Sequence, residues 1–383
     1  MKNQAFLRSR ASFGMSIAGL AALLFAGCGG STGGASSADT VAVSPTAAQV
    51  ATYTDTQIVA LGTGIHVWDS AALGALSFGT NATHPTGQIQ SLSAGQIAAL
   101  SPTQVHAIGA TGPGGVAATS AIRWLNAGAW AALAANTVQV AAITSAEMPT
   151  LTDREIADLG LNVSALSPSA LGAMGSWLKA SNTDNPVGQI ETLSAVQIAA
   201  LSPSQVRFIG ATGAGGVMGT SQIRWLNSGA WGTLVANPAQ VAAMTAEEIG
   251  TITDIEVSLF GANLNLLSNG ALAALKYDTN LINPIGQVQS ISASQVVTLS
   301  SAQIAAFVSK RANIAFLNSG AVSVLSAAQV AVLTPSDFLL VSPGQLALLS
   351  PSALAGLAPV TIASLTPAQK TGLTPTQHSA CGC

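Results

Sequence analysis

The sequence predicts an all-α fold, a solenoid-like stack of short capped helices. Three observations predict it: a unit of eight residues, its nesting in three repeats of about 100 residues, and the composition. The chain has 383 residues and is 49% hydrophobic but only 7% charged, far from the roughly 25% charge of ordinary domains. Such bias together with internal repetition is typical of repeat proteins.

The eight-residue unit reads Ser/Thr-Pro-x-Gln-Val/Ile-x-x-Leu, and each position has a physical reason. The hydroxyl residue is a helix N-cap, and proline suits the first helical position, where no N–H donor is needed. Glutamine three residues after the cap completes a capping box. The two apolar residues share one helical face. The most regular tract has its capping positions at Ser326, Thr334, Ser342, Ser350, Ala358, Thr366 and Thr374.

These units predict separate helical pieces instead of one long helix. Eight residues make about 2.2 turns, so an apolar stripe would rotate around a continuous helix, and the recurring proline would break it. Isolated helices this short are unstable, so they must stack on one another. A β-solenoid is the rival, but Ala, Leu, Gln and capped Pro suit strands badly.

The long period relates three copies. Pro85, Pro186 and Pro284, each followed by x-Gly-Gln, are spaced by 101 and 98 residues. A Thr-Asp pair at 54–55, 152–153 and 253–254 marks a further matching point. Arg-Trp-Leu-Asn at 123–126 recurs at 224–227, with a weaker third copy at 315–318. The resulting segments are a signal peptide (1–27), a Gly/Ser/Thr tether (28–43), repeat 1 (44–143), repeat 2 (144–244), a shortened repeat 3 (245–325), a regular octad tail (326–377) and a Cys-containing C-terminus (378–383).

The amino terminus predicts export. Three basic residues precede a short apolar stretch at 15–25, which is a secretory pattern and too short to span a membrane. The ending Leu24-Phe25-Ala26-Gly27-Cys28 resembles the lipobox of bacterial lipoproteins, although Phe25 stands where Leu is usual. The resemblance implies cleavage before Cys28 and a lipid such as palmitate on it, and Gly29 in place of Asp implies the outer membrane. The alternative is an ordinary signal peptide with an incidental cysteine.

The charge balance argues against nucleic acid as a partner. Removal of residues 1–27 leaves nine basic and fifteen acidic residues, a net charge of −6. Binding to nucleic acid needs clustered Lys and Arg. The sparse charge also leaves little repulsion between copies, which suits self-association.

The tandem Leu-Ser/Thr-x-x-Gln-Val/Ile-x-x-Leu pattern resembles the octapeptide tracts of large bacterial surface and adhesin-like proteins. This resemblance implies an exported, surface-facing repeat protein and carries over no catalytic residue. The segment 100–105 is also similar to the opening of transcription-activator-like effector repeats, but those repeat about every 34 residues and are basic.

Aromatic residues beside arginine are the candidate binding residues. One interpretation is a sugar- or protein-binding pair. The alternative is internal stacking, in which the tryptophan packs with the arginine over its ring. Trp130 and Trp231 occupy apolar octad positions and are expected in the core. The candidates are Arg123, Trp124, Arg224, Trp225 and Phe316.

The remaining polar features predict no catalytic site, no metal site and no cofactor. Glu155, Glu248 and Glu256 each follow a threonine by three residues, so capping explains them. The Gly-rich segments 109–115 and 210–216 are expected to be loops. Cys381 and Cys383 could form a local disulfide, a crosslink between chains or a soft-metal site.

We therefore expect a lipid-anchored protein of the cell envelope that is not an enzyme. Its role would be binding or structural: adhesion, envelope architecture or docking of partner proteins. A glycan- or peptidoglycan-binding module that uses exposed tryptophan is the alternative, and an enzyme with an unrecognised site is the weakest one.

Overall fold

The computed structural model describes residues 43–111, 119–175, 186–212, 219–281, 283–308 and 313–383. Residues 43–383 form one compact unit. The described part is all-α and contains no strand element, only short α-helices and 3-10 helices (η). The predicted fold class is thus confirmed at the level of secondary structure.

The first copy begins at Thr46, whose side chain caps the first helix. Its elements are α1 (Ala47–Val50), α2 (Asp55–Ala60), η1 (Gly62–Val67), α3 (Ser70–Gly74), α4 (Ala94–Ala99), α5 (Pro102–Ala107), η2 (Ile122–Trp124), α6 (Ala127–Ala135) and α7 (Thr137–Ala141). The second copy has η3 (Met148–Thr150), α8 (Asp153–Asp158), η4 (Gly160–Ala165), α9 (Pro168–Gly172), α10 (Gln189–Thr192), α11 (Ala195–Ala200), α12 (Pro203–Val206), η6 (Ile223–Trp225), α13 (Ser228–Ala236) and α14 (Pro238–Ala242).

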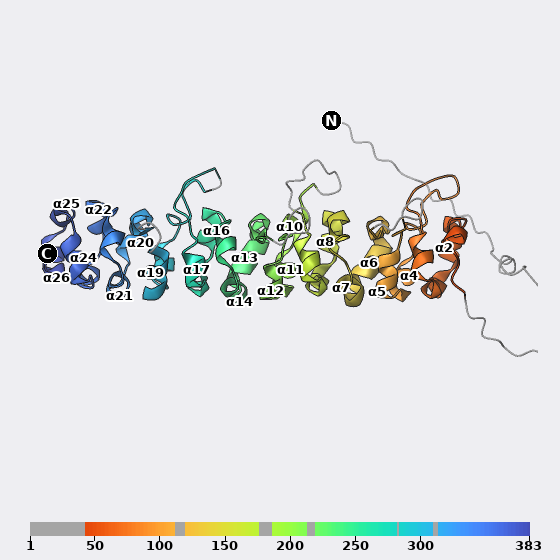
Figure 1. The fold of residues 1–383 in the computed structure, drawn as a ribbon, viewed down its shortest axis with the longest axis horizontal. Helices are drawn as coiled ribbons and strands as arrows, with labels where there is room; N and C mark the ends of the chain where they lie inside the picture. The colour runs from red at the N-terminus through yellow and green to blue at the C-terminus, as the bar shows by residue number, and fades with distance from the viewer. Residues whose placement is uncertain (1–42, 112–118, 176–185, 213–218, 282, 309–312) are drawn as a thin grey trace, which may run out of the picture. The chain divides into compact units, whose positions relative to one another are not determined.

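The third copy and the tail continue in the same way. The third copy has α15 (Ala246–Ile249), α16 (Asp254–Leu259), η7 (Gly261–Leu266), α17 (Asn269–Leu272), α18 (Ala293–Val296), α19 (Ser301–Val308), η8 (Asn313–Phe316) and α20 (Ser319–Ser323). The tail has α21 (Ala327–Val330), η9 (Pro335–Phe338), α22 (Pro343–Leu346), α23 (Pro351–Ala355), α24 (Pro359–Ser364), α25 (Pro367–Thr371) and α26 (Pro375–Cys381). Figure 1 shows α2, α8, α13, α20 and α26 following one another in chain order.

The predicted caps open these helices. In the tail, Ser326, Ser342, Thr366 and Thr374 each make a capping box with the glutamine three residues later. Ala358 occupies the equivalent position without a side-chain cap bond. The period of eight is not uniform, because α6 and α13 run for nine residues before the next asparagine cap.

Glycine redirects the chain where an α-helix passes into a 3-10 helix. Gly62, Gly160 and Gly261 lie at equivalent points of the three copies, with φ between 51° and 52°. This left-handed region is cheap only for glycine. The two helical pieces on either side can therefore point in different directions without an intervening loop.

Glutamine amides join helices that lie far apart in sequence. In Gln329, Oε1 accepts the Ser326 N–H, while Nε2 donates to the carbonyls of Val296 at 2.9 Å and Leu299 at 2.8 Å. One amide thus closes its own cap and also holds a helix that lies earlier in the chain, which its donors and acceptor together allow. The same amide-to-carbonyl bond, across 28 to 42 residues, is made by Gln88, Gln96, Gln104, Gln139, Gln189, Gln197, Gln205, Gln240, Gln287, Gln295, Gln303, Gln345, Gln369 and Gln377.

The apolar residues of the octads form a single core cluster that runs from Val50 to Cys381. Trp130 and Trp231 lie in it at 3% and 1% exposure, so the prediction that they fill the core is confirmed. Contacts of α7 on η4, of α14 on η7 and of α19 on α21 join each copy to the next and the third copy to the tail. The core therefore does not divide at the boundaries between copies.

Candidate functional site

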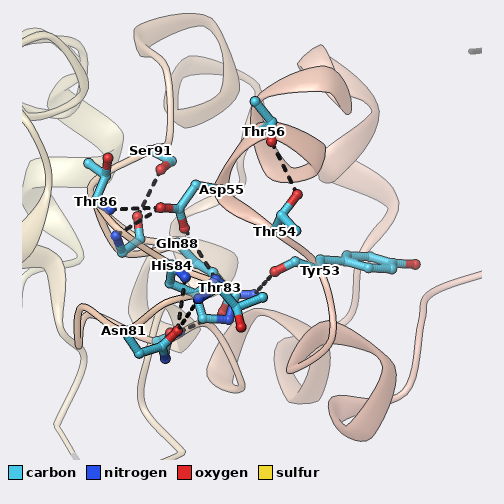
Figure 2. A network of polar contacts seen from close by, with 12 residues as sticks. Tyr53, Thr54, Asp55, Thr56, Asn81, Thr83, His84, Thr86, Gln88 and Ser91 are labelled. Atoms are coloured by element: carbon cyan, nitrogen blue, oxygen red, sulfur yellow. Dashed lines mark hydrogen bonds and ion pairs between the residues drawn. The ribbon is translucent and has the colours of Figure 1, made fainter.

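A buried aspartate holds a loop at the same place in each copy. Asp55, the first residue of α2, accepts the N–H groups of Thr86 at 2.8 Å and Gly87 at 3.1 Å with one carboxylate oxygen. Its other oxygen lies 3.3 Å from His84 Nδ1, and Figure 2 shows this carboxylate facing the loop. The two motifs that marked the long period, Thr-Asp and x-Pro-x-Gly-Gln, therefore contact each other within the fold.

The other two copies repeat this clamp. Asp153 accepts the N–H groups of Val187 and Gly188, at 2.8 and 3.0 Å. Asp254 accepts the N–H of Ile285 at 2.9 Å, and its own N–H donates to Asn283 at 2.8 Å. Asn283 thus takes the place of His84 in the third copy.

Aromatic rings pair beside these loops. Phe78 and Trp124 are nearly parallel, with ring centroids 5.3 Å apart and 2° between their planes, and they are 45% and 37% exposed. Tyr277 stacks on Phe316 in the third copy, with centroids 4.3 Å apart, and both rings are half-buried. Offset stacking of this kind is favourable for aromatic pairs.

Arginine lies over the tryptophan in two copies. The guanidinium carbon of Arg123 is 4.5 Å from the Trp124 ring centroid, and that of Arg224 is 4.8 Å from the Trp225 centroid. Each pair sits on a 3-10 turn of three residues, η2 or η6, directly before an apolar residue of the core. The structure therefore brings together Arg123 with Trp124 and Arg224 with Trp225, as the alternative of internal stacking expects.

The same arginines face buried capping carboxylates. Glu155 and Glu256 complete capping boxes with Thr152 and Thr253, which confirms their predicted role. Burial raises the pKa of Glu155, and the charge of Arg123 partly offsets it. Burial also raises the pKa of Glu256 to about 7, against the hydrogen bonds from Thr253 and the charge of Arg224.

A second set of carboxylates has basic neighbours at another repeat position. His106 Nδ1 lies 2.9 Å from the Glu147 carboxylate, which raises the pKa of His106. Glu147 accepts this hydrogen bond and others from Thr144, and together they outweigh its burial and lower its pKa. In the next copy, burial raises the pKa of Glu248, and the charge of Arg207 opposes that rise. His106 therefore belongs to a repeated position at which the next copy has arginine.

The remaining sequence predictions concern the three cysteines and the two Gly-rich segments. Cys28 lies outside the described residues, as do the leader and most of the tether. Cys381 and Cys383 are joined as a disulfide at the end of α26, and the His378 ring nitrogen Nδ1 lies 2.9 Å from the carbonyl of Cys383. Most of the two Gly-rich segments also falls outside the description.

The described residues contain neither a cluster of metal ligands nor a membrane-spanning helix. Within them, no group of three or more His, Cys, Asp or Glu residues is arranged to hold a metal ion. No helix in the described ranges is long and apolar enough to cross a membrane.

Sequence reasoning missed three features of the site. The first two are the stacking partners Phe78 and Tyr277. The sequence could not predict their stacking, because they lie 46 and 39 residues from their partner rings, Trp124 and Phe316. The third is the aspartate clamp, whose two halves were noted only as markers of the repeat.

No protein-family model matches the chain, and no curated protein matches it.

Proposed function

We propose that the chain is a lipid-anchored repeat protein of the cell envelope with a non-catalytic binding or structural role. The observation that carries the proposal is that the same scaffold recurs along the chain. Amide-to-carbonyl bonds join the helices, and each copy holds an aspartate-clamped loop. Such a framework can present equivalent surface points at regular intervals, which suits adhesion, envelope architecture or partner docking.

Attachment to the membrane is tested through Cys28. In cells given labelled palmitate, the unaltered chain should carry label and fractionate with the outer membrane. Cys28→Ala should carry none and leave the membrane fraction. The double variant Cys381→Ala/Cys383→Ala is the control, since it removes the other two cysteines and should keep the label. A Cys28→Ala protein that stays with the membrane contradicts the anchor.

The binding role is tested with isolated envelope fractions. The intact chain should sediment with them, and prior treatment of the fractions with protease or with glycan-degrading enzymes should show which component retains it. Chain that stays in the supernatant with untreated envelopes contradicts a binding role.

Recognition of glycan is the second candidate, and the exposed Phe78–Trp124 pair favours it. Trp124→Ala and Trp225→Ala should reduce capture on envelope glycan if this candidate holds. Val196→Ala and Val297→Ala, at 60% and 58% exposure, are the matched controls for loss of exposed apolar surface. Unchanged capture by the tryptophan variants removes the basis for this candidate.

A further inference from the structure

The loop between α3 and α4 contains the sequence pattern that accepts N-linked glycans. Residues 81–83, Asn-Ala-Thr, have the form Asn-x-Ser/Thr in which x is not proline. The sequence contains one other such triplet, Asn-Val-Ser at residues 162–164. A triplet this short also recurs by chance, so the surroundings of each asparagine decide whether it can accept a sugar.

The first triplet lies on the surface. All six residues from Phe78 to Thr83 are exposed, and the Phe78 side chain is 45% exposed. The backbone N–H of Thr83 donates a hydrogen bond, but its hydroxyl makes none within the described chain. A modifying enzyme can therefore reach both the asparagine and the hydroxyl that the pattern requires.

A turn determines which end of the Asn81 amide faces outward. Its Oδ1 accepts the N–H groups of Thr83 at 2.8 Å and His84 at 2.9 Å, as Figure 2 shows. Both partners are N–H donors, so the atom that faces them must be the oxygen. The amide nitrogen Nδ2, the atom that bonds to a sugar, is left without an acceptor in the described chain.

This turn is anchored to buried groups. The Asn81 N–H donates to the His84 carbonyl at 2.9 Å, and the His84 side chain is 5% exposed with its Nδ1 3.3 Å from Asp55. Asp55 also accepts the N–H groups of Thr86 and Gly87. The aspartate clamp therefore holds the Asn81 amide at the surface in one arrangement.

The second triplet lacks this presentation. Asn162 lies within η4 and is half-buried. Its Nδ2 donates to the Ala134 carbonyl at 2.7 Å, and its Oδ1 accepts the Thr137 hydroxyl at 3.2 Å. Attachment of a sugar at Asn162 would break a bond between the first and second copies. The second triplet thus serves as a control within the same chain.

The third copy has the same turn without the acceptor pattern. Asn280 Oδ1 accepts the Asn283 N–H at 2.9 Å, and the Asn280 N–H donates to the Asn283 carbonyl at 3.0 Å. No Ser or Thr stands two residues after Asn280 in the sequence. The turn therefore does not depend on a hydroxyl at that position, and Thr83 can be changed without removing it.

The first copy also has few charged groups to hydrate its surface. Residues 43–122 contain two aspartates and no glutamate, lysine or arginine, and one of these aspartates, Asp55, is buried in the clamp. An attached glycan is bulky and solubilising. It would supply the hydration that charged side chains supply on most protein surfaces.

We propose that Asn81 is the acceptor of an N-linked oligosaccharide. The donor class is an oligosaccharide on a polyprenyl diphosphate, and the transfer needs an oligosaccharyltransferase of the producing cell. Nδ2 loses a proton and bonds to the anomeric carbon, while the bond from that carbon to the diphosphate oxygen breaks and polyprenyl diphosphate leaves. This inference rests on export of the chain, which is part of the proposed function.

The test measures the intact mass of the full chain purified from its own cells, with tandem mass spectrometry of the chymotryptic peptide that contains residue 81. Thr83→Ala removes the pattern but keeps the turn, which uses only the backbone of Thr83. Asn81→Asp keeps an oxygen for the turn and removes the amide nitrogen. Thr83→Ser restores a hydroxyl, and Ser164→Ala is the matched control at the second triplet. Far-UV circular dichroism confirms that each variant keeps its helices.

We expect one oligosaccharide on residue 81 of the unaltered chain, of Thr83→Ser and of Ser164→Ala. Thr83→Ala and Asn81→Asp should lose it completely, with their helical signals unchanged. A glycan on a serine or threonine would instead persist in Asn81→Asp, and that result would overturn the proposal.

Labelled palmitate on Cys28 in the same preparations separates this inference from the proposed function. A lipid-labelled chain with an unmodified Asn81 overturns this inference alone. A chain that carries neither lipid nor glycan overturns the exported role and this inference together. An oligosaccharide that persists in Thr83→Ala, or that disappears in Ser164→Ala, overturns the assignment to Asn81.

Discussion

At the scale of single residues, Glu256 shows the cost of a carboxylate in a position that elsewhere holds glutamine. Its Oε2 accepts the Thr253 N–H, and burial raises its pKa to about 7. In an unfolded chain the pKa of glutamate is roughly 4.3. Between these values the folded state binds more protons, so the free energy of unfolding falls as pH rises from about 4.3 to 7.

Glu256→Gln should therefore stabilise the protein above pH 7, by on the order of 1 to 3 kcal/mol, and do little near pH 4. Glutamine keeps the acceptor for Thr253 and needs no ionisation. Thermal melts at pH 4.5 and pH 8 measure the difference. Asp278→Asn, at an exposed position of the third copy, is the control and should leave the two melting temperatures unchanged. Equal destabilisation at both pH values would show that Glu256 acts as a partner for Arg224 first.

The sequence predicted that Glu256 caps a helix, but it did not predict that Arg224 lies near it. The three-residue spacing from Thr253 is local, so capping could be read directly. Arg224 lies 32 residues earlier, and Arg123 precedes Glu155 by the same interval. Pairs across that distance depend on how the pieces stack, which the eight-residue period does not specify.

At the scale of helical elements, the glutamine of the octad both completes a capping box and bonds to an earlier helix, and variants can separate these two roles. Gln329 and Gln57 make the same capping box, but the side chain of Gln329 also donates to two carbonyls. Gln57 is exposed, and its amide donates to no carbonyl of the described chain. A change that keeps the cap and removes the amide therefore isolates the bonds between elements.

Gln329→Glu should destabilise the protein by about 2–4 kcal/mol, because a buried carboxylate would face two carbonyls that have lost their donor. Gln57→Glu is the matched control and should change stability by less than about 0.5 kcal/mol. Urea denaturation followed by circular dichroism measures both. Equal effects would mean that capping alone accounts for the glutamine.

The contribution of the N-caps to stability can be tested by removing one capping hydroxyl and adding another. Ser350 Oγ accepts the Ala353 N–H at 3.1 Å, so Ser350→Ala should cost about 1 kcal/mol. Ala358 has the extended conformation of an N-cap but no cap bond. Ala358→Ser should therefore raise the free energy of unfolding by up to about 1 kcal/mol, measured in the same urea titration. If both changes are neutral, the hydroxyl residues do not open these helices.

The caps, the prolines and the core tryptophans could be predicted because each depends on residues within one octad. The aromatic pairs and the aspartate clamp could not, since their partners lie 29 to 46 residues apart. Both halves of the clamp were visible as repeated motifs. Repetition showed that they matter in every copy, but it did not show that they contact each other.

At the scale of the whole molecule, the α-helices of the described residues have 4 to 9 residues, and isolated helices shorter than roughly 12 residues are marginal in water. Each piece therefore depends on its neighbours for stability. The core cluster continues from Val50 to Cys381. The side-chain amides of Asn162 and Asn263 donate to the carbonyls of Ala134 and Val235 across the two boundaries between copies, and Gln329 bonds across the boundary between the third copy and the tail. These couplings favour a single cooperative transition for residues 43–383.

The distribution of tryptophan makes this cooperativity measurable. All six tryptophans lie between residues 68 and 231, whereas helices continue to Cys381. Fluorescence therefore reports on the first two copies, and circular dichroism reports on all helices. We expect the two signals to lose native character at the same urea concentration, since elements without tryptophan cannot persist once their neighbours unfold. Trp231→Ala, which removes a buried ring packed edge-on against Phe260, should shift both curves together by about 3–5 kcal/mol. A helical signal that survives after the fluorescence change would show that the third copy and the tail fold independently. The coupling between the second and third copies, through contacts such as Asn263 Nδ2 to the Val235 carbonyl, would then be weak.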